Sequence, residues 1–227
     1  MRITDTGRSR EMIDNNYVQK LEHVIKQMLT PLKGIPFPLI IESICDKKVI
    51  KYDPGNVEHL SVLNTLIEVA KWTCEEINKK GIIRTRANEV GNDIEEFVID
   101  SLVKYKLQAN KPKTMSGKVK STGYPDIEFK TPDGTNHYIE CKTYSESTIS
   151  SSMRSFYLSP SEDFKVTHDA IHFIIGFEIY KENNNIYKTK GWKILDAFEL
   201  ECNVKYEFNS DNSRLYRPHM ILAEGII

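Results

Sequence analysis

The amino-acid sequence predicts an α/β fold with a helical N-terminal region. Two observations predict it: long segments with apolar residues at helical spacing come first in the chain, and shorter runs with strand-like alternation follow them. A length of 227 residues is enough to bury a hydrophobic core within one domain. We therefore expect a single domain over 1–227, with a helical N-terminal region at 1–85, a core at 86–180 and a C-terminal region at 181–227.

Three segments carry the apolar pattern of helices, and one carries that of a buried strand. The helices are predicted at Asp14 to Leu29, Val57 to Lys80 and Asn88 to Lys106, with Pro31 to Pro38 as a connector. In the third helix Asn88 or Asn92 is the expected N-cap. Ala170 to Tyr180 is the most apolar run of the chain, which is typical of a central strand buried on both faces.

A β-hairpin is predicted near the middle of the chain. The alternation of residues 126–130 and 137–144 is typical of strands, and a proline and an Asp-Gly pair between them favour a tight reversal. A slip of one residue turns every side chain to the other face, so the loop length decides whether Asp126 shares a face with Glu140 and Lys142. We predict a loop of odd length, or a bulge, because either puts all three on one face.

Two carboxylates and a lysine meet at the end of this hairpin. Pro125-Asp126 is followed, after thirteen residues, by Glu140-Cys141-Lys142. Carboxylate oxygens suit Mg²⁺, and the backbone carbonyl of Cys141 is a further candidate ligand beside Asp126 and Glu140. Lys142 is the candidate to orient a water molecule or to stabilise a pentacovalent oxyanion. These groups match the needs of phosphodiester cleavage, and the plainer alternative is an exposed hairpin with an ion pair.

The spacing from Pro125-Asp126 to Glu140-Cys141-Lys142 resembles the signature of the PD-(D/E)xK nuclease superfamily, best known from type II restriction endonucleases. The resemblance covers about Asn88 to Tyr180. It implies a restriction-endonuclease-like core, a mixed β-sheet flanked by helices. It also implies a homodimer that uses Mg²⁺ to cut double-stranded DNA at a short sequence, leaves 5′-phosphates, and is accompanied by a methyltransferase. A repair or recombination nuclease with the same core, and a catalytically silent DNA-binding module, remain alternatives.

An acidic residue on the helix before the hairpin points at the metal site in many members of this superfamily. The run that contains Glu95 resembles that placement, so Glu95 is predicted as a further catalytic residue. A solvated acidic face at a helix start is the alternative. Glu96 and Glu128 are left open as substitutes for Glu95, and Glu128 is also a possible partner of Lys142.

Side chains suited to DNA gather in three regions. Six lysines and no acidic residue lie between Ser101 and Pro125. Such a segment is suited to binding a polyanion, and the alternative is a solvated loop. A hydroxyl-rich loop with one arginine follows the hairpin. The C-terminal region contains Asn and Arg, which read adenine and guanine but also occur in plain turns. The residues predicted to contact DNA are Lys118, Lys120, Ser152, Arg154, His168, Asn209, Asn212, Arg214 and Arg217.

Composition excludes several other classes of protein. The net charge of −1 argues against a uniformly basic nucleic-acid binder, so any DNA surface must be local. The four cysteines form no C-x-x-C pair and are predicted to be reduced and structural. His168 and His172 are predicted to serve packing and a surface hydrogen bond, because their segment is strand-like and offers no third metal ligand. No apolar leader and no membrane-length apolar run is present, so we expect a cytoplasmic protein.

Overall fold

The computed structural model describes residues 15–120, 122–152, 155–183, 185–207, 209–215 and 217–223. The chain divides into two compact units, one formed by Ile35–Glu201 and the other by Met1–Gly34 together with Cys202–Ile227. The prediction of a single domain over 1–227 stays a prediction.

The unit Ile35–Glu201 is built on a six-stranded mixed sheet with the order β2-β7-β6-β5-β4-β3. Only β5 and β6 pair in parallel among these strands, and every other neighbouring pair is antiparallel. The strands are β2 (Ile82–Ile83), β3 (Gln108–Asn110), β4 (Ile127–Lys130), β5 (Asn136–Tyr144), β6 (Ile171–Asn183) and β7 (Ile186–Asp196). The predicted class, a mixed sheet flanked by helices, is confirmed.

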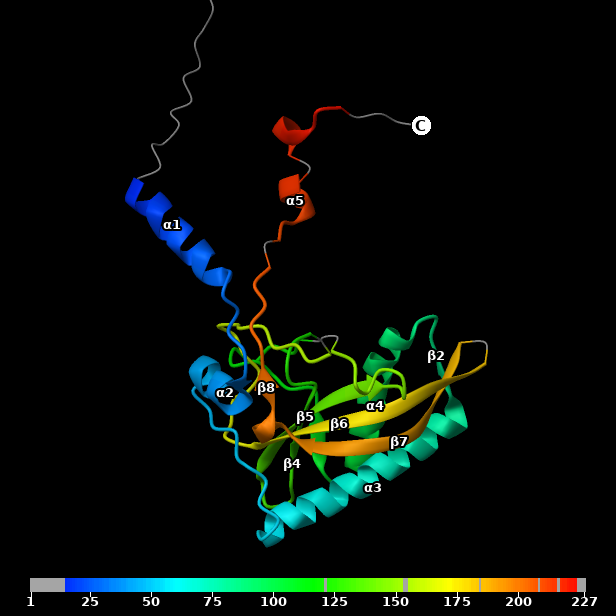
Figure 1. Ribbon diagram of the computed structural model, residues 1–227. Helices are drawn as coiled ribbons and strands as arrows, with labels where there is room; N and C mark the ends of the chain where they lie inside the picture. The colour runs from blue at the N-terminus through cyan, green and yellow to red at the C-terminus, as the bar shows by residue number, and fades with distance from the viewer. Residues whose placement is uncertain are drawn as a thin grey trace, which may run out of the picture. The chain divides into compact units, whose positions relative to one another are not determined.

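Two helices, α3 (Val57–Lys80) and α4 (Val90–Lys104), pack against one face of this sheet, and Figure 1 shows α3 running alongside β7. Their apolar side chains join those of the strands in one hydrophobic core. The predicted limits of α3 are confirmed. The predicted N-cap of α4 is wrong, because a 3₁₀ turn at Ala87–Glu89 precedes this helix and Glu89 takes the N-cap position without a side-chain cap.

The N-terminal side of the same unit contains a helix that the sequence pattern missed. Pro31 to Pro38 is predicted as a connector, but α2 (Phe37–Cys45) begins at Phe37, directly after β1 (Ile35–Pro36). A proline is tolerated in the first turn of a helix, where its missing N–H has no acceptor to lose. Phe37 and Ile41 of α2 are almost completely buried.

In the other unit, α1 (Asn15–Met28) confirms the first predicted helix, whereas α5 (Asn212–Leu215) is a single short turn. The remaining short elements are the 3₁₀ turns η2 (Ala197–Glu199) and η3 (Pro218–Met220) and the strand β8 (Glu201–Cys202). None of the helices formed by the described residues combines the length and hydrophobicity that crossing a bilayer requires.

Candidate active site

The hairpin register brings the predicted carboxylates together. In the β4–β5 ladder Ile127 lies opposite Ile139, and Lys130 lies opposite Asn136, which leaves a loop of residues 131–135. One step beyond the first pair, Asp126 comes to lie opposite Glu140. The loop is therefore odd in length, as predicted, and the predicted register of the hairpin is confirmed.

The two faces of the hairpin differ in what they contact. Ile139 and Cys141 belong to the hydrophobic core that α3 and α4 share with the sheet. Because neighbouring residues of a strand alternate in direction, Glu140 and Lys142 leave by the opposite face. The backbone N–H of Cys141 donates to Asp126 Oδ2 at 2.8 Å, and Lys142 Nζ donates to Glu140 Oε1 at 2.7 Å. These contacts fix all three polar side chains within one cluster, which we call the hairpin cluster (Asp126, Glu140 and Lys142).

The carboxylates of the hairpin cluster lack full compensation for their charge. Glu140 is 4% exposed, and burial first and the charge of Asp126 second raise its pKa, although Lys142 opposes the shift. Burial also raises the pKa of Asp126, against the hydrogen bond from the Cys141 N–H. Glu140 Oε2 is buried, and none of the described residues donates a hydrogen bond to it. A buried carboxylate oxygen without a donor is costly to the fold, and such an oxygen is typical of a functional group.

A divalent cation fits this arrangement. Among the described residues no group of three or more His, Cys, Asp or Glu side chains is arranged to hold a metal ion. Mg²⁺ does not need such a group, because it binds through one or two carboxylates and takes its remaining oxygen ligands from water and substrate phosphate. Asp126 and Glu140 have the carboxylate chemistry that such an ion requires, and their assignment as metal ligands stays a prediction.

Of the three acidic candidates for a further catalytic residue, Glu95 is the one that the structure brings near the cluster. Burial and then the charge of Asp126 raise its pKa, and Lys111 Nζ lies 3.6 Å from its carboxylate. Glu96 is exposed on α4. Glu128 Oε1 lies 3.5 Å from His168 Nδ1. Glu128 thus contacts His168 instead of Lys142.

A second lysine beside the cluster was missed by the sequence reasoning. Lys165 is 5% exposed, and its Nζ donates to the carbonyl oxygens of Gly123 at 2.7 Å and Pro125 at 3.2 Å. Burial lowers its pKa, and the charge of Asp126 is the largest influence that raises it. Lys165 therefore ties down the turn that immediately precedes Asp126. No spacing or periodicity in the sequence signals this role.

Buried aromatic side chains support the same end of the sheet. The hydroxyl of Tyr124 lies 2.6 Å from His172 Nδ1, and the ring of Phe156 packs edge-on against Tyr124 and Phe37. Burial lowers the pKa of His172 to about 3, so this imidazole is neutral. Packing is thus the role of His172, as predicted. Lys142 Nζ lies 5.8 Å from the centre of the Phe156 ring.

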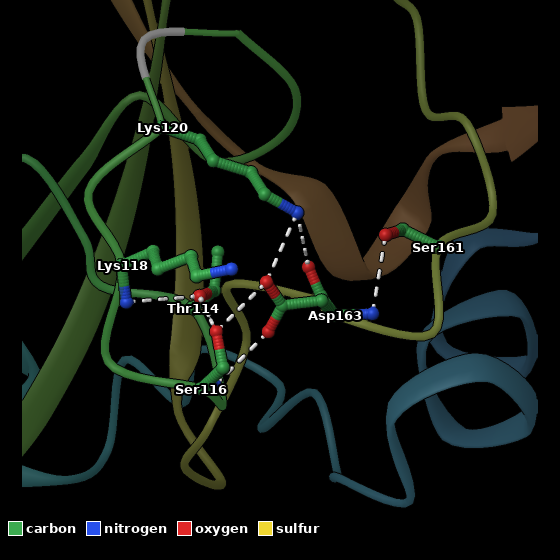
Figure 2. Close-up of polar contacts among 6 residues, drawn as sticks. All are labelled: Thr114, Ser116, Lys118, Lys120, Ser161 and Asp163. Carbon is green, nitrogen blue, oxygen red and sulfur yellow. Dashed lines mark hydrogen bonds and ion pairs between the residues drawn. The ribbon is translucent and has the colours of Figure 1, made fainter.

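Two of the lysines predicted to contact DNA, Lys118 and Lys120, lie within or beside a separate polar cluster, shown in Figure 2. Asp163 accepts hydrogen bonds from the Ser116 N–H at 2.9 Å and the Ser116 hydroxyl at 3.0 Å, and Lys120 Nζ lies 3.1 Å from the same carboxylate. We call Ser116, Lys120 and Asp163 the loop cluster. Lys118 is exposed at its edge, where its backbone N–H donates to Thr114 Oγ1. The charge of Lys120 is thus already paired within the protein.

The other predicted DNA contacts are dispersed. Ser152 is exposed in the loop after β5, and Arg154 lies outside the described residues. His168 is about half exposed and contacts Tyr138 and Thr167 in addition to Glu128. The C-terminal candidates, all exposed and all in the unit that contains α1, are Asn209, Asn212, Arg214 and Arg217. Each of these assignments to DNA stays a prediction.

Comparison with known proteins adds a family to this geometry. The sequence model of the type II restriction enzyme MjaV family matches residues 31–219 of the chain. Type II restriction enzyme MjaV of Methanocaldococcus jannaschii is 41% identical over 228 aligned residues, which cover 94% of this chain and 98% of that protein. Both matches include the whole hairpin and the loop cluster.

Proposed function

The chain belongs to the type II restriction enzyme MjaV family, and on that premise we propose that the hairpin cluster is the centre at which it cuts double-stranded DNA at specific sites. The observation that carries this assignment is that the buried oxygen Glu140 Oε2 receives no hydrogen bond from the described residues. Glu140 itself lies opposite Asp126 in the hairpin. A structural ion pair would satisfy both oxygens of its carboxylate. An oxygen kept free beside a second carboxylate is suited to a cation.

The proposed reaction is hydrolysis of the phosphodiester on its 3′-oxygen side. Water attacks phosphorus, the bond from phosphorus to O3′ breaks, and the products are a 5′-phosphate and a 3′-hydroxyl that has gained a proton. Mg²⁺ held by Asp126 and Glu140, with the Cys141 carbonyl as a further candidate ligand, would supply neutralising charge and a more acidic water. Lys142 extends from the same face of β5 and donates its hydrogen bonds to the attacking water or to the phosphoryl oxygens.

Neighbouring residues hold this centre in place. The Cys141 N–H fixes one oxygen of Asp126, which leaves the other oxygen for the cation. Lys165 fixes the carbonyls of Gly123 and Pro125 in the turn before Asp126. Glu95 approaches from α4 and is proposed to bind water molecules at the outer side of the site.

We further propose that two copies of the chain act together, because a duplex has two strands to cut and each chain offers one hairpin cluster. The same proposal sets the protein in the cytoplasm, where foreign DNA is met. Host DNA would then need protection by a methyltransferase that modifies the same sequence.

Gel analysis of a long unmethylated phage DNA tests this function. The purified protein is incubated with Mg²⁺ or with EDTA, alongside the Asp126→Ala and Lys142→Ala variants. We expect discrete fragments that need Mg²⁺ and disappear in both variants. Lys71→Ala is the matched control, because Lys71 Nζ also lies 2.7 Å from a glutamate, Glu68, but on the exposed surface of α3.

Three other results contradict the proposal. A smear in place of discrete bands indicates a nuclease guided by DNA structure instead of sequence. Absence of cleavage by the wild-type protein, with DNA binding retained, indicates a silent binding module. Loss of cleavage in Lys71→Ala as well as in Lys142→Ala removes the assignment to the hairpin cluster.

A further inference from the structure

The sheet face opposite α3 and α4 contains a hollow with a volume of about 1160 Å³, which we call the sheet basin. Its floor consists of side chains from β5, β6 and β7, and its rim includes the hydroxyl-rich loop 145–151. Lys142 lines the sheet basin, so the hollow is continuous with the hairpin cluster. We propose that the sheet basin holds the sugar-phosphate backbone of duplex DNA beside the scissile phosphate, with Lys190 and Lys193 of β7 as its cations. This inference rests on the proposed function.

Lys142 and Lys193 lie in one row of residues that runs across three strands of the sheet. Lys142 on β5 pairs with Gly176 on β6, and Gly176 pairs with Lys193 on β7. Residues in one row share a face, so Lys193 extends into the sheet basin on the side from which Lys142 extends. Two strand spacings separate their backbones by about 10 Å. Two long side chains on one face at that separation are suited to phosphates of one DNA strand.

Gly176 shapes the floor between the two lysines. A Cβ atom at this position would lie 3.4 Å from the ring of Tyr144, so this ring lies directly over Gly176. The Nζ atom of Lys193 lies 6.0 Å from the centre of the same ring. An aromatic face attracts an ammonium group but accepts no conventional hydrogen bond, so the N–H groups stay available to an anion.

A β-bulge brings Lys190 to the same hollow. Glu178 pairs with Gly191 and the next residue, Ile179, pairs with Thr189, which leaves Lys190 without a partner on β6. An unpaired residue in a bulge changes the direction of its side chain, and bulges occur often beside functional sites. Lys190 lines the sheet basin, and its Nζ lies 5.6 Å from the centre of the Tyr180 ring.

The charges around the sheet basin indicate which kind of partner it binds. Neither Lys190 nor Lys193 forms an ion pair with a carboxylate in the part of the chain that the structure describes. Four lysines line the sheet basin (Lys142, Lys181, Lys190 and Lys193), against two glutamates (Glu146 and Glu178). On the same strand, Lys188 Nζ lies 2.8 Å from Glu182 and does not line the hollow. An excess of cations beside a phosphodiesterase site matches a polyanion.

Salt dependence of DNA binding tests the inference. Fluorescence anisotropy measures the affinity for a labelled random-sequence duplex of 30 base pairs in EDTA, over a series of KCl concentrations, for the wild type, Lys190→Ala, Lys193→Ala and the double variant. We expect the slope of log K against log salt to fall by about one for each lysine removed, since each phosphate contact releases counterions. Lys188→Ala, the matched control on the same strand, should leave the slope unchanged, and Lys193→Arg should retain the wild-type slope.

Other results overturn the inference, and one cleavage assay separates it from the proposed function. Unchanged slopes in both alanine variants, with their melting temperatures retained, show that the sheet basin does not hold DNA. Unchanged slopes together with a shift between monomer and dimer in sedimentation show that this face joins two copies of the chain. If wild-type protein cleaves phage DNA with Mg²⁺ but the slopes do not change, only the inference fails. If the wild type does not cleave, the proposed function itself fails.

Discussion

Two clusters in this molecule contain the same chemical groups, carboxylate and lysine, in opposite conditions. In the loop cluster, Asp163 is partly exposed, accepts hydrogen bonds from Ser116 and pairs with Lys120, and these contacts lower its pKa. In the hairpin cluster, burial raises the pKa values of both Asp126 and Glu140. One buried oxygen there, Glu140 Oε2, receives no hydrogen bond within the part of the chain that the structure describes.

The difference separates a carboxylate that stabilises the fold from one that we propose binds a ligand. A carboxylate whose oxygens accept hydrogen bonds from its own chain stabilises the fold and has little left to offer a substrate. Buried carboxylates that face each other cost stability until a cation arrives, and such perturbed groups are typical of functional sites. Lysine content alone does not distinguish the two cases, because each cluster contains one paired lysine.

The largest expected effect is on catalysis. Glu140→Gln should reduce DNA cleavage by at least about 10²–10³-fold, because a main source of charge stabilisation is lost. Its melting temperature in EDTA should stay unchanged or rise, because a buried, poorly compensated charge has been removed. Asp163→Asn should do the reverse, with cleavage within a few-fold of wild type and a lower melting temperature. Cleavage rates and thermal unfolding of both variants measure this, and similar losses of cleavage in the two would break the comparison.

The next effect is stabilisation by a divalent cation. A ligand that binds only the folded protein at 100 times its Kd adds about 2.7 kcal/mol of stability. Mg²⁺ or Ca²⁺ should therefore raise the melting temperature of the wild type and of Asp163→Asn. The same ions should have little effect on Asp126→Asn or Glu140→Gln. Calorimetric titration without DNA gives an independent measure, and equal binding to all four proteins would show that the hairpin cluster is not the cation site.

The hairpin cluster was predictable because its information is local. Strand alternation and one turn decide which side chains share a face, so the odd loop length before residue 136 was enough to join Asp126 to Glu140 and Lys142. The long helix α3 was predictable for the same reason, since its apolar period extends over 24 residues. Local pattern was thus enough to predict the mixed α/β class and the residues of the hairpin cluster.

Contacts between distant segments were not predictable from such patterns. The six lysines between Ser101 and Pro125 appear in the sequence as one basic run, but the fold separates them: Lys104 lies over the Trp72 ring, Lys111 meets Glu95, and Lys120 meets Asp163. Conversely, β7 was included in a C-terminal recognition region instead of being predicted as a strand. Its alternation is broken at the bulge, so the row that joins Lys193 to Lys142 had no sequence signal.

The Lys165→Met variant tests whether a buried lysine beside the hairpin cluster supports catalysis, in contrast to Lys120 of the loop cluster. Lys165→Met removes the donor to two carbonyls next to Asp126 and should reduce kcat by about 10–100-fold, the usual cost of losing a group that orients a metal ligand. KM for DNA should change little, because Lys165 is buried and positions Asp126 without touching DNA. Lys120→Met is the control and should leave kcat near the wild-type value. A change in KM alone for Lys165→Met contradicts the positioning role.

The smallest expected effect is on the pH dependence of stability in EDTA. This measurement distinguishes the hairpin cluster from the loop cluster most directly. The folded-state pKa of Glu140 lies above its ordinary 4.5, so its charge costs stability at neutral pH and the cost disappears as pH falls through the folded pKa. The stability gained by Glu140→Gln over the wild type should therefore be greatest near pH 8 and shrink toward pH 5. The folded-state pKa of Asp163 lies below 3.8, so its contribution is present above that pH and is lost only in stronger acid. The loss of stability in Asp163→Asn should then be constant from pH 5 to pH 8, as melting temperatures over that range will show. If the gain of stability in Glu140→Gln does not depend on pH, the charge of the buried Glu140 carboxylate is already compensated, as that of Asp163 is.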